Sequence, residues 1–129
     1  MFEKFKVEII SPERSILKTE TSEVIIPSYE GEMGILKDHI PLITFLRPGI
    51  IKIIDGNKKK FFAEEGTVEF SNNNLLILTP RAIEVSNIDK NSLDGLINEA
   101  EKKISNDEIT DKEKYLLSYK IETLKNINQ

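Results

Sequence analysis

Residues 50–62 read IIKIIDGNKKKFF, so two apolar runs stand on either side of a short polar turn. The turn contains Asp55-Gly56, and glycine adopts the positive φ of a tight hairpin turn without a steric penalty. A second pattern of this kind surrounds the run Asn72-Asn73-Asn74, and asparagine also tolerates positive φ. We therefore predict two β-hairpins between residues 50 and 78.

Toward the N-terminus, short apolar runs continue at a similar spacing. Phe5, Val7 and Ile9 alternate with polar residues, which places one face of a strand inside and the other in water. Further runs lie at 16–17, 24–26, 35–36 and 42–43, and another follows at 83–85. Many short strands separated by turn residues are typical of a sandwich or barrel. Residues 1–87 are therefore predicted to form an antiparallel β-sandwich.

The period of the apolar residues changes after Asn87. A helical stripe with spacing i, i+3, i+4, i+7 and i+11 contains Leu93, Leu96, Ile97, Ala100 and Ile104. Asn91 or Ser92 is expected to cap the start of this helix, because either side chain can accept a bond from a free backbone amide. The sequence thus predicts a first helix soon after the last strand.

A second helix is predicted to begin after Thr110. Thr110 and Glu113 have the spacing of a capping box, in which each side chain satisfies the other residue's backbone amide. The stripe of this helix contains Leu117, Ile121 and Leu124. Two amphipathic helices joined by a short loop pack antiparallel, so residues 88–129 are predicted to form a two-helix hairpin.

Composition excludes several classes of function. The chain has 18 Lys and Arg against 22 Asp and Glu, and this formal charge of -4 argues against a nucleic-acid partner. No cysteine is present, which excludes disulfides and thiolate chemistry. No uncharged apolar run approaches the roughly 20 residues of a membrane helix, so any membrane association is expected to go through partners.

The sequence contains no recognisable catalytic arrangement. His39 is the sole histidine, and no serine or second histidine completes a nucleophile arrangement around it. Nucleotide-binding loop motifs are also missing. We therefore predict no catalytic residue, no metal site and no cofactor. A biotinyl or lipoyl carrier is the alternative class, since Lys58, Lys59 and Lys60 follow a hairpin turn, but such carriers have no helical tail.

Residues 27–49 contain glycines, prolines and apolar residues without a clean strand or helix period. We expect Glu30, Gly31, Glu32 and Gly34 to lie in an exposed loop. This stretch can be a plain connection between strands whose apolar residues fill the end of the sandwich. The alternative is a stiff, partly apolar surface that binds another protein.

Residues 30–49, EGEMGILKDHIPLITFLRPG, resemble the hallmark stretch of the epsilon subunit of F-type ATP synthases, called the delta subunit in mitochondria. In that family, E-G-x-x-G-I is followed by H-x-P-L-x-T-x-L-x-P-G at the same spacing. The resemblance implies a noncatalytic rotor subunit of the central stalk. Such a subunit links gamma to the ring of c subunits and couples proton transport to ATP synthesis.

Positions are carried over from the family residue by residue. The residues expected to face the c ring are Glu30, Gly31, Glu32 and Gly34. The residues expected beside gamma are His39, Pro41, Leu42 and Thr44. The resemblance also places the chain at the cytoplasmic face of a bacterial inner membrane, as a peripheral subunit.

The family resemblance gives the helical hairpin a regulatory role. In bacterial members it folds against the sandwich or extends toward the alpha and beta subunits and inhibits ATP hydrolysis. Some members bind ATP through an I-D-x-x-R-A sequence, of which Ile88 and Asp89 match the beginning. Ser92 and Leu93 stand where Arg and Ala would be, so the fixed cation for phosphate is missing and nucleotide binding is doubtful.

Overall fold

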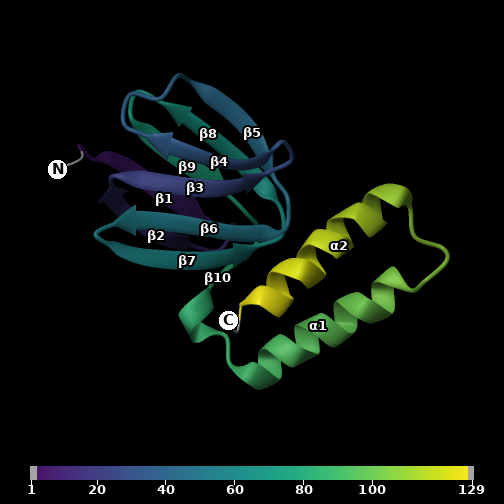
Figure 1. The fold of residues 1–129 in the computed structure, drawn as a ribbon. Helices are drawn as coiled ribbons and strands as arrows, with labels where there is room; N and C mark the ends of the chain where they lie inside the picture. Colours follow the sequence, from purple (N-terminus) through teal and green to yellow (C-terminus); the bar gives the residue numbers. More distant parts are fainter. Residues whose placement is uncertain (1–2, 128–129) are drawn as a thin grey trace.

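The computed structural model describes residues 3–127, and within them the strands precede the helices, as Figure 1 shows. The strands are β1 (Phe5–Ile10), β2 (Ser15–Thr21), β3 (Glu23–Ser28), β4 (Gly31–Leu36), β5 (Leu42–Leu46), β6 (Gly49–Asp55), β7 (Asn57–Ala63), β8 (Gly66–Ser71), β9 (Asn74–Leu78) and β10 (Ala82–Glu84). A 3-10 turn, η1 (Val85–Asn87), leads into the helices α1 (Lys90–Ile104) and α2 (Asp111–Asn126). The predicted class, a sandwich followed by a helical hairpin, is confirmed.

The strands form one folded sheet in the order β10-β7-β6-β3-β5-β8-β9-β1-β2, with β4 paired to β3. Four hairpins of consecutive strands, β1–β2, β3–β4, β6–β7 and β8–β9, supply most of the pairing. One pair departs from the antiparallel prediction, because β1 and β9 run parallel. The hydroxyls of Thr21 and Ser22 both donate to the Ile54 carbonyl, which holds the end of β2 near β6. The sheet thereby folds back on itself.

The core of the sandwich follows the period of two. On β1, Phe5, Val7 and Ile9 are buried while Lys6 between them is exposed. The buried cluster contains Phe5, Val7, Ile9, Val24, Ile26, Ile35, Leu46, Ile51, Ile53, Phe61, Ala63, Val68, Phe70, Leu75 and Ile77. Burying a side chain of this size stabilises a fold by about 1.5–3 kcal/mol before the loss of conformational entropy, so this cluster dominates the stability.

Two consecutive phenylalanines on β7 depart from simple alternation. Phe61 points into the sandwich core, so Phe62 must point to the outer face of the sheet. Phe62 is nevertheless buried, because it packs with Leu93 of α1 and Leu124 of α2. Its cross-strand neighbour Ile50 joins the same cluster. The helical hairpin of α1 and α2 therefore covers part of the outer face of β6 and β7.

Both predicted turns have the expected backbone. Gly56 has φ 73° between β6 and β7, and Asn72 and Asn73 have φ 50° and 60° between β8 and β9. These values lie in the left-handed region that glycine and asparagine tolerate best. The two predicted hairpins are confirmed.

The helix starts confirm one predicted cap and correct the other. The Thr110–Glu113 capping box is present at the start of α2. At α1 the cap is Asp89, not Asn91 or Ser92, because the Asp89 carboxylate accepts the Ser92 backbone N–H at 2.7 Å. Asn91 and Ser92 therefore belong to the first turn of the helix.

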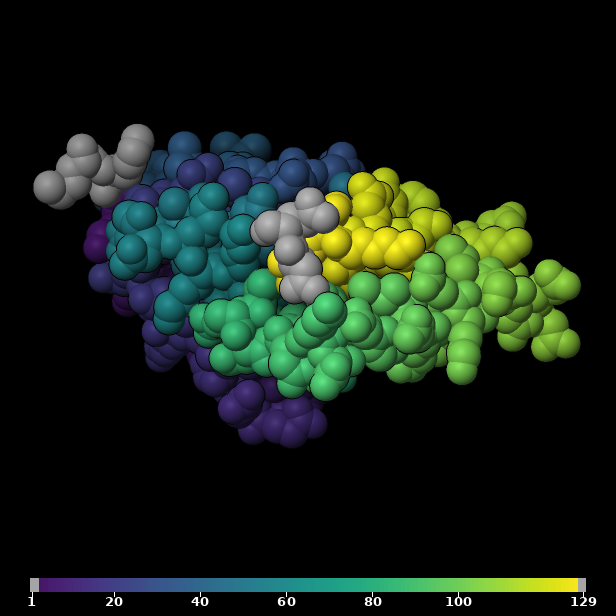
Figure 2. Space-filling model, turned by 60° about the horizontal axis from the view of Figure 1, so that its bottom comes forward, coloured from purple at the N-terminus to yellow at the C-terminus, as the bar shows by residue number. Residues whose placement is uncertain are grey.

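The two helices lie side by side and antiparallel (Figure 1). An ion pair of 3.3 Å between Glu101 of α1 and Lys125 of α2 links them. Figure 2 shows that the loop between the helices projects away from the sandwich, and the helices contact the sandwich through the start of α1 and the second half of α2.

Candidate partner-binding surface

The turn between β3 and β4 is built from hydrogen bonds of Ser28. The buried Ser28 hydroxyl donates to the Gly31 carbonyl at 2.7 Å and accepts the Glu30 backbone N–H at 3.2 Å. Gly31 has φ 121°, a conformation that only glycine adopts readily. Glu30 is thus presented at an exposed, well-defined turn.

The expected loop around Glu32 and Gly34 is a strand. Both residues lie on β4, which pairs with β3 in continuous register, so the predicted exposed loop is wrong beyond Glu30. The Glu32 carboxylate lies 3.7 Å from the Lys52 ammonium. A Cβ at Gly34 would meet only Glu23 Oε2 at 3.6 Å, an ordinary contact. Glycine is therefore required by the backbone at Gly31 but not at Gly34.

His39 and Pro41 lie in the connection between β4 and β5. The His39 ring meets Phe70 edge-on, with centroids 5.9 Å apart, and His39 Nδ1 donates to the Ile40 carbonyl at 2.7 Å. Pro41 is exposed just before β5. His39 is half-buried, so its ring packs within this connection and only part of it is accessible to a partner.

Strand β5 points its side chains in alternating directions. Leu42 packs against the sandwich core and Thr44 is 6% exposed, so these two expected gamma-side residues face inward. Ile43 and Phe45 face outward and are 74% and 55% exposed. Ile40, also 74% exposed, precedes them in the connection. We call Ile40, Ile43 and Phe45 the apolar face.

Sequence reasoning missed the apolar face for a specific reason. Residues 42–46 read LITFL, so four of the five side chains are apolar and both faces of the strand look alike. Thr44 is the one polar residue in this run, and a threonine among apolar residues suggests a side chain that faces solvent. That indication is wrong here, because Thr44 is buried. The pairing of β5 with β8 determines which face is covered, and Thr44 lies opposite the buried Val68.

Two polar contacts hold α2 against the sandwich. The Lys120 ammonium lies 2.9 Å from the Glu64 carboxylate, and the Lys120 side chain is only 9% exposed. The Arg47 guanidinium lies over the Tyr119 ring, 4.0 Å from its centroid. Lys120 could have been found from the sequence, because it lies three residues after Leu117 and four before Leu124, on the buried stripe of α2.

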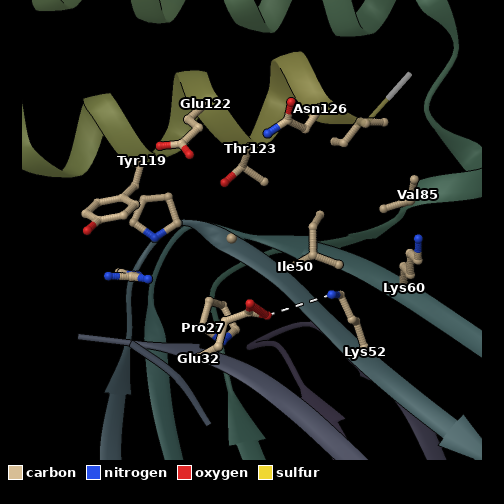
Figure 3. A pocket seen from close by; sticks show the side chains of 14 residues that line it. Pro27, Glu32, Ile50, Lys52, Lys60, Val85, Tyr119, Glu122, Thr123 and Asn126 are labelled. Atoms are coloured by element: carbon tan, nitrogen blue, oxygen red, sulfur yellow. Dashed lines mark ion pairs between the residues drawn. The ribbon is translucent and has the colours of Figure 1, made fainter. Parts of the chain in front are cut away.

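A pocket of about 360 Å³ lies where α2 meets the sandwich. In Figure 3, Glu122, Thr123 and Asn126 extend from α2 toward Ile50 and Lys52 of β6. The Glu32–Lys52 ion pair lies on the opposite wall. Acidic and basic groups both line the pocket, so its charge does not select one ionic ligand. One expected c-ring residue, Glu32, therefore borders the surface on which the hairpin docks.

Ile88 and Asp89 have structural roles in this conformation. Ile88 packs against the cluster of Phe62, Leu93 and Leu124. The hydrogen bond from the Ser92 backbone N–H, together with one from the Ser92 side chain, lowers the pKa of Asp89. Leu93 is buried, so no side chain at that position is free for a ligand. The expected nucleotide site stays a prediction without further support.

Residues 3–127 contain no group of three or more His, Cys, Asp and Glu side chains that could hold a metal ion. None of the helices in this range is long and apolar enough to cross a membrane. The features that stand out are thus surfaces: the β3–β4 turn, the apolar face and the junction with the hairpin.

Comparison with known families places these surfaces in context. A family described as "ATP synthase, Delta/Epsilon chain, beta-sandwich domain" matches residues 4–85, the part that contains all ten described strands. The chain belongs to the ATP synthase delta/epsilon family. The resemblance inferred from residues 30–49 is confirmed, and family membership replaces the carrier alternative for Lys58 to Lys60.

Relatives of the epsilon type match most or nearly all of the chain. The ATP synthase epsilon chain of Pelagibacter ubique is 48% identical over 130 residues, which cover 99% of this chain and 100% of the relative. The ATP synthase epsilon chain of Sinorhizobium fredii is 33% identical over 78% of this chain and 76% of the relative. As an epsilon-type member, the chain is a noncatalytic stalk subunit of ATP synthase.

Solved structures share the fold of this epsilon-type chain. A chain of the Euglena gracilis mitochondrial ATP synthase, in a structure of OSCP, F1 and c ring, aligns with a TM-score of 0.83 at 23% identity, covering 100% of this chain and 84% of that chain. A chain of the Tetrahymena thermophila mitochondrial ATP synthase central stalk and c ring aligns with a TM-score of 0.67 at 18% identity, covering 98% and 96%. Both alignments include the helical hairpin as well as the sandwich.

Proposed function

We propose that this chain links gamma to the c ring in the central stalk of a proton-transporting ATP synthase. The observation that supports this role most directly is the apolar face, on the outer side of β5 and the connection that precedes it. Ile40, Ile43 and Phe45 are 74%, 74% and 55% exposed within six residues of the chain, and exposed large apolar side chains that lie together mark surfaces that bind other proteins. Family membership supports gamma as the partner that we propose for this face.

The apolar face replaces Leu42 and Thr44 as the gamma-side contact. Leu42 and Thr44 face the core beneath it. Substituting either residue would therefore disturb the packing of the sandwich, and any effect on partner binding would be indirect. Aromatic and large aliphatic side chains at the centre of an interface carry most of its binding energy. On β5, the large apolar side chains that face outward are Ile43 and Phe45.

Binding to purified gamma tests this contact. We expect the double substitution Ile43→Ser and Phe45→Ser to weaken binding about tenfold or more while the sandwich stays folded. Tyr115→Ala is the matched control, because Tyr115 is another exposed aromatic residue but lies on α2. Equal binding by the double variant and the wild type would contradict the gamma contact. Failure of the wild type to bind gamma would contradict the function itself.

The β3–β4 turn is proposed to face the polar loops of the c ring. An exposed ion pair contributes only about 0–1 kcal/mol, so the shape of the turn should matter more than the charge of Glu32. Gly31→Ala forces a side chain into φ 121°, whereas Gly34→Ala has room for its Cβ. We expect Gly31→Ala to reduce proton-coupled ATP synthesis by the reconstituted enzyme and Gly34→Ala to leave it near wild type. The opposite order would contradict this assignment.

The hairpin is proposed to restrain ATP hydrolysis through alpha and beta when it leaves the sandwich. The docked arrangement, with a small apolar junction and two polar contacts, supports a reversible attachment. Comparing hydrolysis by the complete enzyme with and without residues 88–129 tests this role. We expect faster hydrolysis without the hairpin, and an unchanged rate would contradict inhibition. We also propose that the chain acts as a peripheral subunit at the cytoplasmic face of a bacterial inner membrane, which the bacterial origin of the epsilon-chain relatives supports.

A further inference from the structure

The connection between β4 and β5 is short, yet it presents one of the three residues of the apolar face. Ile40 is 74% exposed at its end. A free apolar side chain in a flexible connection would fold onto the nearest apolar surface. The contacts of the preceding residues, Asp38 and His39, explain why Ile40 stays outside.

Asp38 is tied to a turn that lies 35 residues further along the chain. The Asp38 backbone N–H donates to Asn73 Oδ1 at 2.7 Å, and Asn73 Nδ2 donates to Asp38 Oδ1 at 3.0 Å. Asp38 has φ 66° and Asn73 has φ 60°, so each residue adopts a left-handed conformation that turns it toward the other. We call this reciprocal pair the clasp.

The clasp is itself attached to the sandwich through β1. The Asn73 carbonyl accepts the Lys6 backbone N–H at 3.1 Å, which attaches the β8–β9 turn to β1. On the other side of the connection, Lys37 pairs with Glu3 at 3.1 Å. The connection is therefore attached at Asp38 to the β8–β9 turn and at Lys37 to Glu3, which precedes β1.

His39 braces the connection immediately after the clasp. Its ring rests edge-on against Phe70, and its Nδ1 donates to the carbonyl of Ile40. Its backbone N–H donates to the Leu36 carbonyl at 3.1 Å. Because residues 38 and 39 are both held, the backbone direction at Ile40 is set before any partner arrives.

We propose that Asn73 is a positioning residue for partner binding: through the clasp with Asp38 it holds Ile40 in the orientation that the partner recognises. The proposal rests on the proposed function, in which gamma binds the apolar face. A surface that is already ordered loses less conformational entropy on binding than a flexible one. Asn73 should thus affect affinity although it is not part of the apolar face.

Two neighbouring asparagines offer a matched pair of variants. Asn72 and Asn73 both have positive φ in the same turn, so glycine fits the backbone at either position. Asn73→Gly removes both bonds of the clasp, whereas the Asn72 side chain forms none of the hydrogen bonds described in residues 3–127. We expect Asn73→Gly to weaken gamma binding about fivefold to tenfold and Asn72→Gly to change it less than twofold.

A side-chain exchange tests whether the bonds themselves matter. Asn73→Asp alone sets two carboxylates against each other and should weaken binding. The double variant Asp38→Asn with Asn73→Asp restores a donor opposite an acceptor, and we expect it to recover most of the wild-type affinity. A structural effect on the turn alone would not be reversed by a change at Asp38.

Amide exchange in the isolated chain separates this proposal from the proposed function. We expect the backbone amide of Asp38 to exchange faster in Asn73→Gly than in Asn72→Gly, with the strand amides unchanged. If wild-type chain binds gamma and Asn73→Gly binds equally well, the positioning role is wrong. If wild-type chain does not bind gamma, the proposed function is wrong, and equal exchange at Asp38 in both variants would also reject the clasp.

Discussion

In the sandwich, apolar side chains from most of the strands meet in one core, whereas the hairpin rests on the sandwich through a much smaller cluster. Phe62, Leu93 and Leu124 are the buried members of that cluster within the described residues. Polar contacts supplement it, namely the Lys120–Glu64 ion pair and the stacking of Arg47 on Tyr119. Regions with few buried apolar contacts open at lower free energy than a core does. The two parts should therefore respond differently to the same kind of change.

The sandwich core should show the largest effect. Phe70 is 1% exposed and meets Phe5 edge-on, with ring centroids 5.6 Å apart. We expect Phe70→Ala to lower the free energy of unfolding by about 3–5 kcal/mol, because it removes buried surface and leaves a cavity. Denaturant unfolding measures this loss. Ile43→Ala on the exposed side is the control and should change the value by less than about 0.5 kcal/mol.

The junction should come second, and its loss should be confined to the hairpin. Leu124→Ala is expected to weaken docking by about 2–3 kcal/mol, at the lower end for a buried leucine because a helix on a surface can shift. Hydrogen exchange should rise in α1 and α2 and stay low in the strands. A chain that ends at Asn87 is the control, and we expect it to unfold cooperatively as a separate sandwich. Loss of protection in the strands of either variant would contradict independent folding of residues 1–87 and 88–129.

The ion pair at the junction should have a smaller effect. Glu64→Ala leaves the nearly buried Lys120 ammonium without its carboxylate, but Glu64 itself is 46% exposed and solvent screens the pair. We expect docking to weaken by about 1 kcal/mol, again measured by exchange in α2. Glu99→Ala breaks the exposed pair with Lys103 and should cost less than about 0.5 kcal/mol. Equal effects of the two substitutions would show that burial of Lys120 does not matter.

The cap of α1 should give the smallest effect, visible only in acid. The Ser92 backbone N–H lowers the pKa of Asp89 below its ordinary value of 3.8. Because the pKa of Asp89 is lower in the folded state, the charged cap stabilises the helix fully at pH values above the ordinary pKa. This contribution is lost as the pH falls through the lowered pKa of the folded state. Exchange of the Ser92 amide against pH measures the change. Asp89→Asn keeps the cap without its charge and should flatten this acid response.

The clearest failures of prediction lie where several apolar residues follow one another. In residues 42–46 the sequence contains no contrast between the two faces of a strand, so Thr44 and Leu42 were expected outside and Ile43 was overlooked. The family resemblance located the right segment, and the pairing of β5 with β8 selected the outward side chains. The clasp was also beyond reach, because Asp38 and Asn73 are 35 residues apart and each looks like an ordinary turn residue.

The sequence by itself determined the local features of this protein: the turn at Gly56, the turn at Asn72 and Asn73, the capping box of α2 and the change of period after Asn87. Backbone sterics and hydrogen bonds between residues a few positions apart are sufficient for each of them. The tertiary structure alone decided that Phe62 is buried and that Ile43 is not. Burial depends on which distant element covers a face, and neither the hairpin over β7 nor β8 beside β5 can be read from the residues that they cover.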